Sequence, residues 1–200
     1  MYIRIRRHND ILWLILDHPP LNILTITMLD QLTAAMHDAL KDLPRLVVIT
    51  GVGEKAFSAG VDIHDHLDGR EKEMLRAVYD NCAAFAELRR RHVATVALVK
   101  GCALGGGCEL AALCDTIMAD ERATFALPEI SLGVFPPVAA VSFPALIGRK
   151  AAMRLILTGE TITAQEAFRI GFVHQLLPAR YFLADAEELL AVLASTARTP

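Results

Sequence analysis

The sequence is poor in the features that mark disulfide-bonded, zinc-binding or phosphate-cradling proteins. It has four cysteines among 200 residues, and no two of them form a CxxC pair: Cys82, Cys102, Cys108 and Cys114. All four lie in apolar stretches, so we expect buried thiols in a reducing compartment and no metal site. The pattern GxxxxGK[ST] is also missing, which excludes a P-loop.

A signal sequence and an uninterrupted membrane span are missing as well. The N-terminus, MYIRIRRHND, lacks the apolar core of a signal peptide, so we expect a cytoplasmic protein. The longest uncharged run, Ile130 to Gly148, contains three prolines, and we interpret it as a buried loop and short helix. The net charge of −3 gives no reason to expect a nucleic-acid or membrane partner.

Apolar strands, loops and helices alternate along the chain. Hydrophobic residues make up 54% of it, which is ample for the core of one domain. Periodicity predicts strands at 2–6, 11–16, 46–50, 95–99, 116–119 and 124–127. It predicts helices at 25–41, 70–91, 108–113 and 181–195, with a mostly helical region from Arg149 onward. This alternation is typical of an α/β protein.

Two glycine-bearing loops follow buried strands and share one design. GVGEKAFSAGVDI occupies residues 51–63, and GCALGGGCEL occupies residues 101–110. Glycine permits positive φ and a close approach to the main chain, so amide N–H groups there can converge on one oxygen and form an oxyanion hole. The alternative is that the glycines only permit tight strand–helix packing. GVGEKA also fits a loose dinucleotide-binding pattern, but no convincing helix follows it.

Two glutamates lie in apolar stretches of the sequence. Glu109 follows the triple glycine, and Glu129 lies in the segment ALPEISLG. Glutamate is seldom buried without a partner or a task. Two half-buried carboxylates near an oxyanion hole indicate acid–base chemistry beside a stabilised enolate. Helix capping or pairing with a nearby arginine is the alternative, and periodicity alone does not decide between them.

Three motifs in this order resemble the enoyl-CoA hydratase (crotonase) superfamily: KAFSAGVDI, KGCALGGGCELAALCD and FALPEISLGV. The later segment AAMRLILTGETITAQEAFRIGFVHQLLP is similar to the family's next block, so the resemblance extends from about residue 12 to residue 178. It implies an α/β fold, a crotonase-like spiral of repeated ββα units, over 1–178. Relatives continue through more C-terminal helices, so we expect 179–200 to be a shortened start of that helical region.

Matched by position, the resemblance implies roles for four residues. The amides of Val61 and Gly106 would form the oxyanion hole for an acyl-CoA thioester, and Glu109 and Glu129 match the two acids of hydratases. Many relatives that isomerise or hydrolyse lack one of these acids. We therefore expect a hydratase acting on an enoyl- or dienoyl-CoA, with no cofactor beyond the coenzyme A that the substrate carries.

The resemblance also implies substrate contacts. Four residues would line the acyl and pantetheine channel: Val61, Asp62, Ile63 and His64. Phe135 would lie beside the acyl pocket, in a run (GVFPPVAA) where many relatives carry glycines, so we expect a tight, apolar pocket. This run, with SAGVD and HDH, is similar to the cyclic dienoyl-CoA hydratases that act on cyclohexa-1,5-diene-1-carbonyl-CoA.

Several alternatives stay open at this point. His64 and His66 could form an H-x-H metal pair, or only a polar loop at the substrate mouth. The family implies a homotrimer or hexamer. An isomerase or C–C hydrolase of the same fold is the alternative enzyme, and an RNA-binding protein of this fold is the alternative outside catalysis. Only two arginine clusters, 4–7 and 89–91, would support RNA binding, and the net negative charge favours solvated surface as the role of both.

Overall fold

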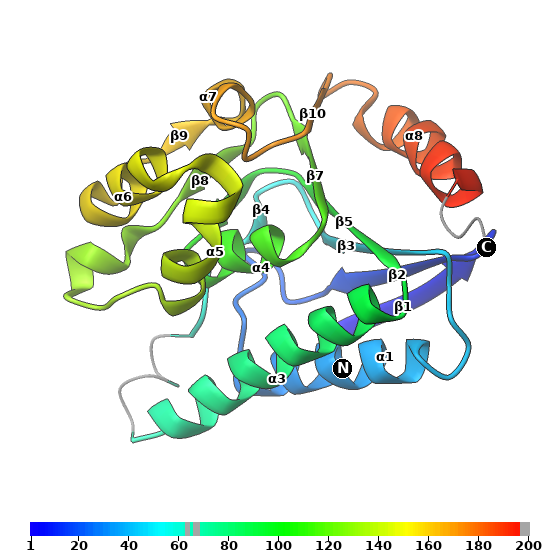
Figure 1. Cartoon of the computed structure of the whole chain (residues 1–200), viewed down its shortest axis with the longest axis horizontal. Coiled ribbons are helices and arrows are strands. Elements are labelled where there is room, and N and C mark those ends of the chain that lie inside the picture. Colours follow the sequence, from blue (N-terminus) through cyan, green and yellow to red (C-terminus); the bar gives the residue numbers. More distant parts are fainter. Residues whose placement is uncertain (63–64, 66–68, 197–200) are drawn as a thin grey trace.

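Figure 1 shows a two-sheet α/β structure, a computed structural model that describes residues 1–62, 65 and 69–196. The elements follow the predicted order, and most predicted bounds are correct to within about two residues. Their bounds are β1 (Ile3–His8), β2 (Ile11–Leu16), α1 (Ile26–Ala39), β3 (Leu46–Gly51), β4 (Ala56–Ser58), α3 (Glu71–Arg90), β5 (Ala94–Val99), β6 (Cys102–Leu104), α4 (Gly106–Leu113), β7 (Thr116–Asp120), β8 (Thr124–Ala126), the 3₁₀ helix η1 (Pro128–Leu132), α5 (Pro137–Ile147), α6 (Arg149–Thr158), β9 (Ile162–Thr163), α7 (Ala164–Arg169), β10 (Gln175–Leu177) and α8 (Phe182–Thr196).

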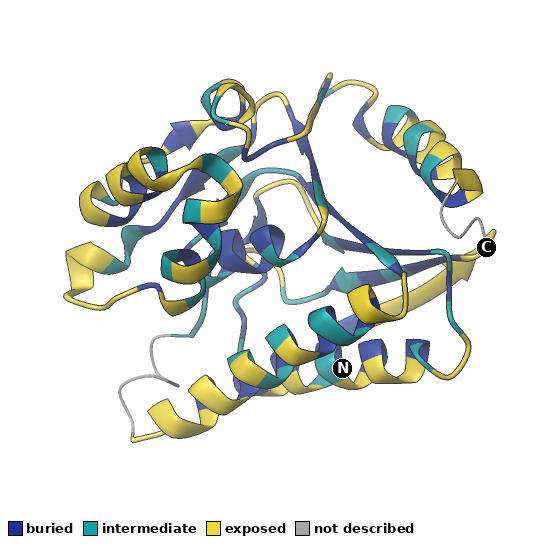
Figure 2. Cartoon of the chain, viewed as in Figure 1, coloured by how far each residue is buried: buried dark blue, intermediate teal, exposed yellow. Residues whose placement is uncertain are grey.

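The larger sheet has the strand order β1-β2-β3-β5-β7-β10. Its strands are parallel except for β1, which pairs antiparallel with β2. Helices α1 and α3 lie side by side over one face, and α8 packs against the other. Because both faces are covered, the central strands are almost entirely buried, as Figure 2 shows.

The smaller sheet, in the order β4-β6-β8-β9, is built from the continuations of the larger one. β3, β5 and β7 are followed along the chain by β4, β6 and β8 respectively. β4 pairs parallel with β6, and β6 pairs parallel with β8. Each turn of the chain therefore stacks on the previous one, and the predicted spiral is confirmed. Its consequence for function is that the loops after β4 and β6 must lie beside each other.

Helices α1 and α3 pack against each other through largely apolar faces. Thr25 caps α1, where its side-chain oxygen accepts a hydrogen bond from the Met28 amide at 3.2 Å. In α3, Met74 and Phe85 are buried, whereas Val78 and Cys82 are only half-buried. The buried face also includes Ala77, Asn81, Ala84 and Leu88.

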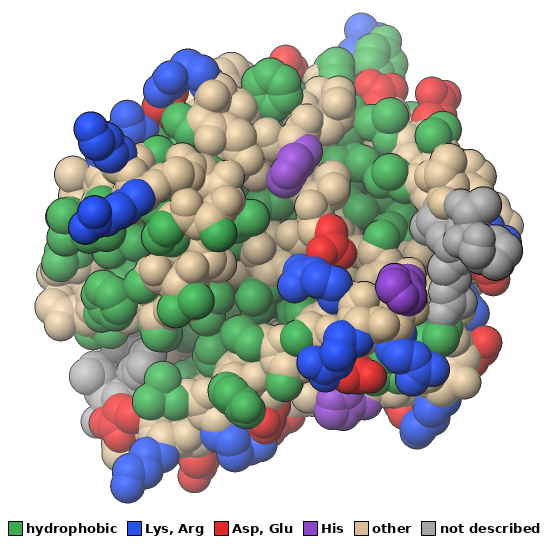
Figure 3. All heavy atoms as spheres, viewed as in Figure 1, with side chains coloured by type: hydrophobic (Ala, Val, Ile, Leu, Met, Phe, Trp, Pro, Cys, Tyr) green, Lys and Arg blue, Asp and Glu red, His purple; other side chains and the backbone are tan. Residues whose placement is uncertain are grey.

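The prediction that the run Ile130 to Gly148 is buried is wrong. Four of its large hydrophobic residues are exposed around η1 and the loop that follows: Ile130, Leu132, Val134 and Phe135. The proline pair starts α5, which buries only Ala139 and Phe143, one turn apart, so its other faces meet solvent. Hydrophobic side chains gather on this side of the molecule in Figure 3.

The cysteine prediction is correct for two of the four thiols. All four cysteines are free, but only Cys108 and Cys114 are buried, whereas Cys82 and Cys102 are half-buried. Cys82 lies in the middle of α3 and Cys102 at the start of β6, so an apolar sequence neighbourhood does not by itself bury a thiol. Among the described residues, no helix combines the length and the apolar character that crossing a membrane requires.

Candidate active site

Val61 and Gly106 lie against each other at the ends of two paired strands. Val61 follows β4 and forms a parallel bridge with Leu24, and Gly106 begins α4 directly after β6. A Cβ atom placed on Gly106 would lie 2.9 Å from Val61 Cγ1 and 3.4 Å from the Val61 amide nitrogen. Neither amide donates a hydrogen bond to any described residue. Two unused N–H donors therefore lie at neighbouring positions, as an oxyanion hole requires.

Each glycine of the triple-glycine turn excludes a side chain for a different reason. Gly105 has φ of +52°, and a Cβ there would lie 2.7 Å from Glu129 Oε1. A Cβ on Gly106 would intrude on Val61, as just described. A Cβ on Gly107 would lie 2.4 Å from the Ser58 carbonyl oxygen, so only glycine lets α4 approach β4 this closely. The same glycine turn therefore permits close packing of α4 on β4 and also leaves its amide groups accessible.

Glu109 is a buried acid one turn into α4. Glu109 is only 7% exposed. Its Oε1 atom accepts a hydrogen bond of 2.8 Å from the amide of Ala139, which lies in the first turn of α5. Burial raises the pKa of Glu109 to about 7. The Ala139 and Val138 amides oppose this rise, and the negative charge of Glu129 adds to it. A carboxyl with a pKa near neutrality is suited to proton transfer.

Glu129 lies in η1 and is held against the glycine turn at Gly105. Its Oε2 atom is buried and has no hydrogen-bond partner among the described residues. Burial raises the pKa of this acid, which favours its protonated form. No described arginine or lysine forms an ion pair with Glu109 or Glu129, so the arginine-pairing alternative is not supported. The capping alternative applies only to Glu109, at the start of α5.

A small cavity of about 30 Å³ joins several of these groups. Its walls include Val61, Gly106 and Glu109, with aliphatic side chains and Asn81 completing them. This volume has room for a water molecule. Sequence reasoning missed Asn81, although an asparagine on the apolar face of a predicted helix was a readable signal.

The remaining predicted contacts are distributed unevenly. Asp62 is half-buried, and its amide donates to the Leu24 carbonyl at 3.1 Å. Ile63 and His64 lie outside the described residues, and so does His66 of the proposed metal pair. Phe135 is 61% exposed, while Val138 of the same run lines the cavity. In the parts of the chain that the structure describes, no group of three or more histidines, cysteines and acids is placed to hold a metal ion.

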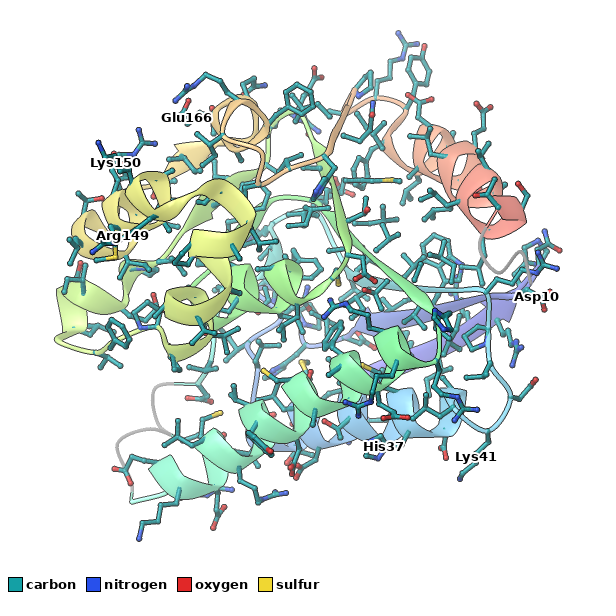
Figure 4. All side chains as sticks on the ribbon, viewed as in Figure 1. Asp10, His37, Lys41, Arg149, Lys150 and Glu166 are labelled. Carbon is teal, nitrogen blue, oxygen red and sulfur yellow. The ribbon has the colours of Figure 1, made fainter. Side chains whose placement is uncertain are left out.

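Apart from Glu109, which lines the cavity, many charged side chains lie around the outside of the molecule. Figure 4 shows Arg149 and Lys150 on α6 and Glu166 on α7 at the periphery. The arginine clusters considered for RNA binding are engaged in surface ion pairs: Arg7 with Asp42 at 2.6 Å and Arg89 with Asp115 at 2.9 Å. These pairs support the interpretation of both clusters as solvated surface.

The raised pKa of Glu109 predicts a stability that falls as pH increases. The folded state keeps the proton up to about pH 7, whereas the unfolded chain releases it near 4.5. Between these values the folded state binds more protons, so the free energy of unfolding decreases with pH by about 3 kcal/mol in total. Glu109→Gln should therefore be more stable than wild type at pH 8 and similar to it at pH 4.

Urea unfolding of both proteins at several pH values measures this difference, and other titrating groups cancel between them. A wild-type-minus-variant difference that is flat across this range would show that the Glu109 side chain is solvated.

Comparisons with known proteins agree with this geometry. The chain matches the model of the family described as Enoyl-CoA hydratase/isomerase over residues 6–199. It is 34% identical to the mitochondrial enoyl-CoA hydratase of Pongo abelii, covering 96% of this chain and 66% of the relative. It is 33% identical to the 2,3-dehydroadipyl-CoA hydratase of Escherichia coli, covering 95% and 74%. The chain spans between about half and two thirds of the length of several curated relatives that it matches.

Solved structures give the same result. An enoyl-CoA hydratase from Bacillus anthracis superposes with a TM-score of 0.89 at 30% identity, covering 98% of this chain and 78% of that one. DspI of Pseudomonas aeruginosa gives a TM-score of 0.90 at 31% identity, covering 100% and 76%. The stacked turns, the glycine turn with its unused amides and the family match together lead to one conclusion: the chain belongs to the enoyl-CoA hydratase/isomerase family.

Proposed function

We propose that this protein adds water across the C=C bond of an enoyl-CoA thioester. One observation carries the proposal: Val61 and Gly106, whose amides are unused, and the buried residue Glu109 line the same small cavity. Relatives whose names are those of hydratases support it. The presence of two acids favours hydration over the isomerase and hydrolase alternatives, because hydration needs a base for water and an acid for carbon.

The thioester oxygen would accept hydrogen bonds from both amides. As a nucleophile adds to the β-carbon, electrons move from the C=C bond toward that oxygen, and the enolate charge collects there. Donors that are fixed before the reaction stabilise this charge without reorganisation, and a single one contributes about 3 kcal/mol. The glycine turn thus lowers the barrier to addition and does not itself transfer a proton.

The two glutamates would divide the proton transfers. Glu109 lines the cavity, and the Ala139 amide stabilises its ionised form, so it is suited to take a proton from water. The water oxygen bonds to the β-carbon as that proton leaves. Glu129, whose buried oxygen lacks a partner, would keep its proton and deliver it to the α-carbon. Repulsion between the two carboxylates favours one shared proton near neutral pH.

For the acyl group, we propose a conjugated dienoyl-CoA, including cyclohexa-1,5-diene-1-carbonyl-CoA. Its support is the proline- and valine-bearing run, from which Val138 reaches the cavity wall. A homotrimer or hexamer in the cytoplasm is part of the same proposal.

The test compares crotonyl-CoA with the cyclic dienoyl-CoA and follows loss of the conjugated absorbance. Hydration of the dienoyl thioester with higher kcat/KM supports the narrower proposal, and hydration of crotonyl-CoA alone removes it. A product with a shifted double bond and no added water would identify an isomerase instead.

A further inference from the structure

Asn81 is a polar residue on the buried face of α3. It is 2% exposed, and its neighbours along that face are the small residues Ala77 and Ala84. Helix α3 packs there against α1, side by side with it in Figure 1. A buried amide side chain normally satisfies both its nitrogen and its oxygen, so the partners of Asn81 indicate what it does.

The orientation of the Asn81 amide follows from its partners. Nδ2 donates to the Leu29 carbonyl oxygen at 3.0 Å and to Thr33 Oγ1 at 2.8 Å, both in α1. A carbonyl oxygen only accepts, so the nitrogen, and not the oxygen, must face Leu29. Both amide hydrogens are therefore used within the protein, and this tether fixes the side chain.

The Asn81 oxygen is left without a partner. Oδ1 is buried, and no described residue donates a hydrogen bond to it. The residue lines the small cavity with Glu109, and these two carry the only polar side chains among its described lining residues. Other walls are aliphatic, with Leu24 and Leu113 among them. A hydrogen-bond donor that entered this cavity could therefore pair with Asn81 Oδ1.

We propose that Asn81 is a specificity-determining residue whose side-chain oxygen accepts a hydrogen bond from a hydroxyl group on the acyl chain of the substrate. The inference rests on the proposed function, because it takes the cavity to be part of the acyl site. A hydrocarbon acyl group that reaches the same place, the cyclic dienoyl ring included, would keep the oxygen buried and unpaired, and an unpaired buried acceptor weakens binding about tenfold or more. The assignment therefore rests on the proposed hydration reaction and competes with the narrower proposal of a hydrocarbon dienoyl group. Sites built to pair a hydroxyl group discriminate strongly against ligands that lack it.

The experiment compares straight-chain enoyl-CoA thioesters of increasing length, each paired with the same chain carrying a terminal hydroxyl. Wild type should favour the hydroxylated member about tenfold in kcat/KM at the length that brings the hydroxyl to Asn81. Asn81→Leu, similar in size but without an acceptor, should remove or reverse this ratio. An Asn81→Ala variant makes the same comparison if leucine prevents folding.

Thr33→Val is the matched control, because it removes one partner of the amide nitrogen and leaves the oxygen in place. It should retain the wild-type preference. A wild-type ratio near one at every length, or an equal loss of both substrates in Asn81→Leu, would overturn the proposal. The first result would mean that a bound water pairs with the oxygen, and the second that Asn81 serves to hold α3 against α1.

Binding of the saturated thioester pairs, measured by calorimetry, separates this inference from the proposed reaction. These ligands cannot be hydrated, so a hydroxyl preference that depends on Asn81 would stand even if no hydration were found. Hydration without such a preference would remove the Asn81 assignment alone.

Discussion

Replacing Glu109 or Glu129 with glutamine is expected to lower kcat for enoyl-CoA hydration by about 100-fold or more. Each substitution removes one proton-transfer group, and general acid–base catalysis typically contributes about 10²- to 10⁴-fold. Both variants should fold, since glutamine keeps the size of the side chain. At position 109 its oxygen can still accept the hydrogen bond from the Ala139 amide. Loss of absorbance by the conjugated thioester measures the rate.

The double variant should be little slower than the slower single variant, because two groups that act in one step are not additive. Glu71→Gln, in the exposed first turn of α3, is the matched control and should keep wild-type kcat. Full activity in either active-site variant would remove that acid from the mechanism. It would leave a reaction that needs only one proton-transfer group, such as isomerisation.

Gly106→Ala should lower kcat by about 10²- to 10³-fold and leave the protein folded. The added methyl would lie 2.9 Å from Val61 Cγ1 and 3.4 Å from the Val61 amide nitrogen, so it displaces one proposed donor from the other. Removing a single oxyanion donor typically has this effect on kcat. Since alanine favours a helix more than glycine does, the start of α4 should not be weakened.

Gly107→Ala separates the chemistry of this turn from its packing. Its methyl would meet the Ser58 carbonyl oxygen at 2.4 Å, a backbone contact that cannot rotate away. We expect it to lower the free energy of unfolding by about 1–3 kcal/mol, as overpacking does, with a smaller effect on kcat of the folded fraction. Thermal unfolding and initial rates on both variants test the pair. Equal rate losses, or unfolding of both, would contradict the assignment of an amide role to Gly106.

Much of the fold follows from local patterns. Continuous apolar runs such as 46–50 and 95–99 indicate strands covered on both faces, and α1 and α8 cover them as such runs require. The prediction that the run from Ile130 is buried was wrong, because hydrophobicity alone does not show whether another helix or strand covers a segment. There the proline pair fixes the start of α5 and leaves most of its faces outward.

The site was predictable where the backbone determines it. The Val61 and Gly106 amides meet because β4 and β6 pair, so their strand-end positions fix the geometry. Side-chain contacts across helices were not predictable in this way. The tether from Asn81 to α1 joins residues about 50 positions apart, and no local pattern specifies such a contact. The roles of all the predicted site residues, with Phe135 and residues 63–64 among them, stay predictions.

The hydrogen bond from the Ala139 amide to Glu109 connects the position of this carboxyl group to the segment that lines the cavity. Val138 precedes Ala139 and lines the cavity, so the wall that we propose to contact the acyl chain also donates the hydrogen bond that holds the Glu109 carboxyl group. A poorly shaped acyl chain that pushes this wall outward would swing the proton acceptor out of line. Under the proposed mechanism, a poorly fitting acyl-CoA would then bind but not react, so selection among substrates would appear in kcat and not in binding affinity.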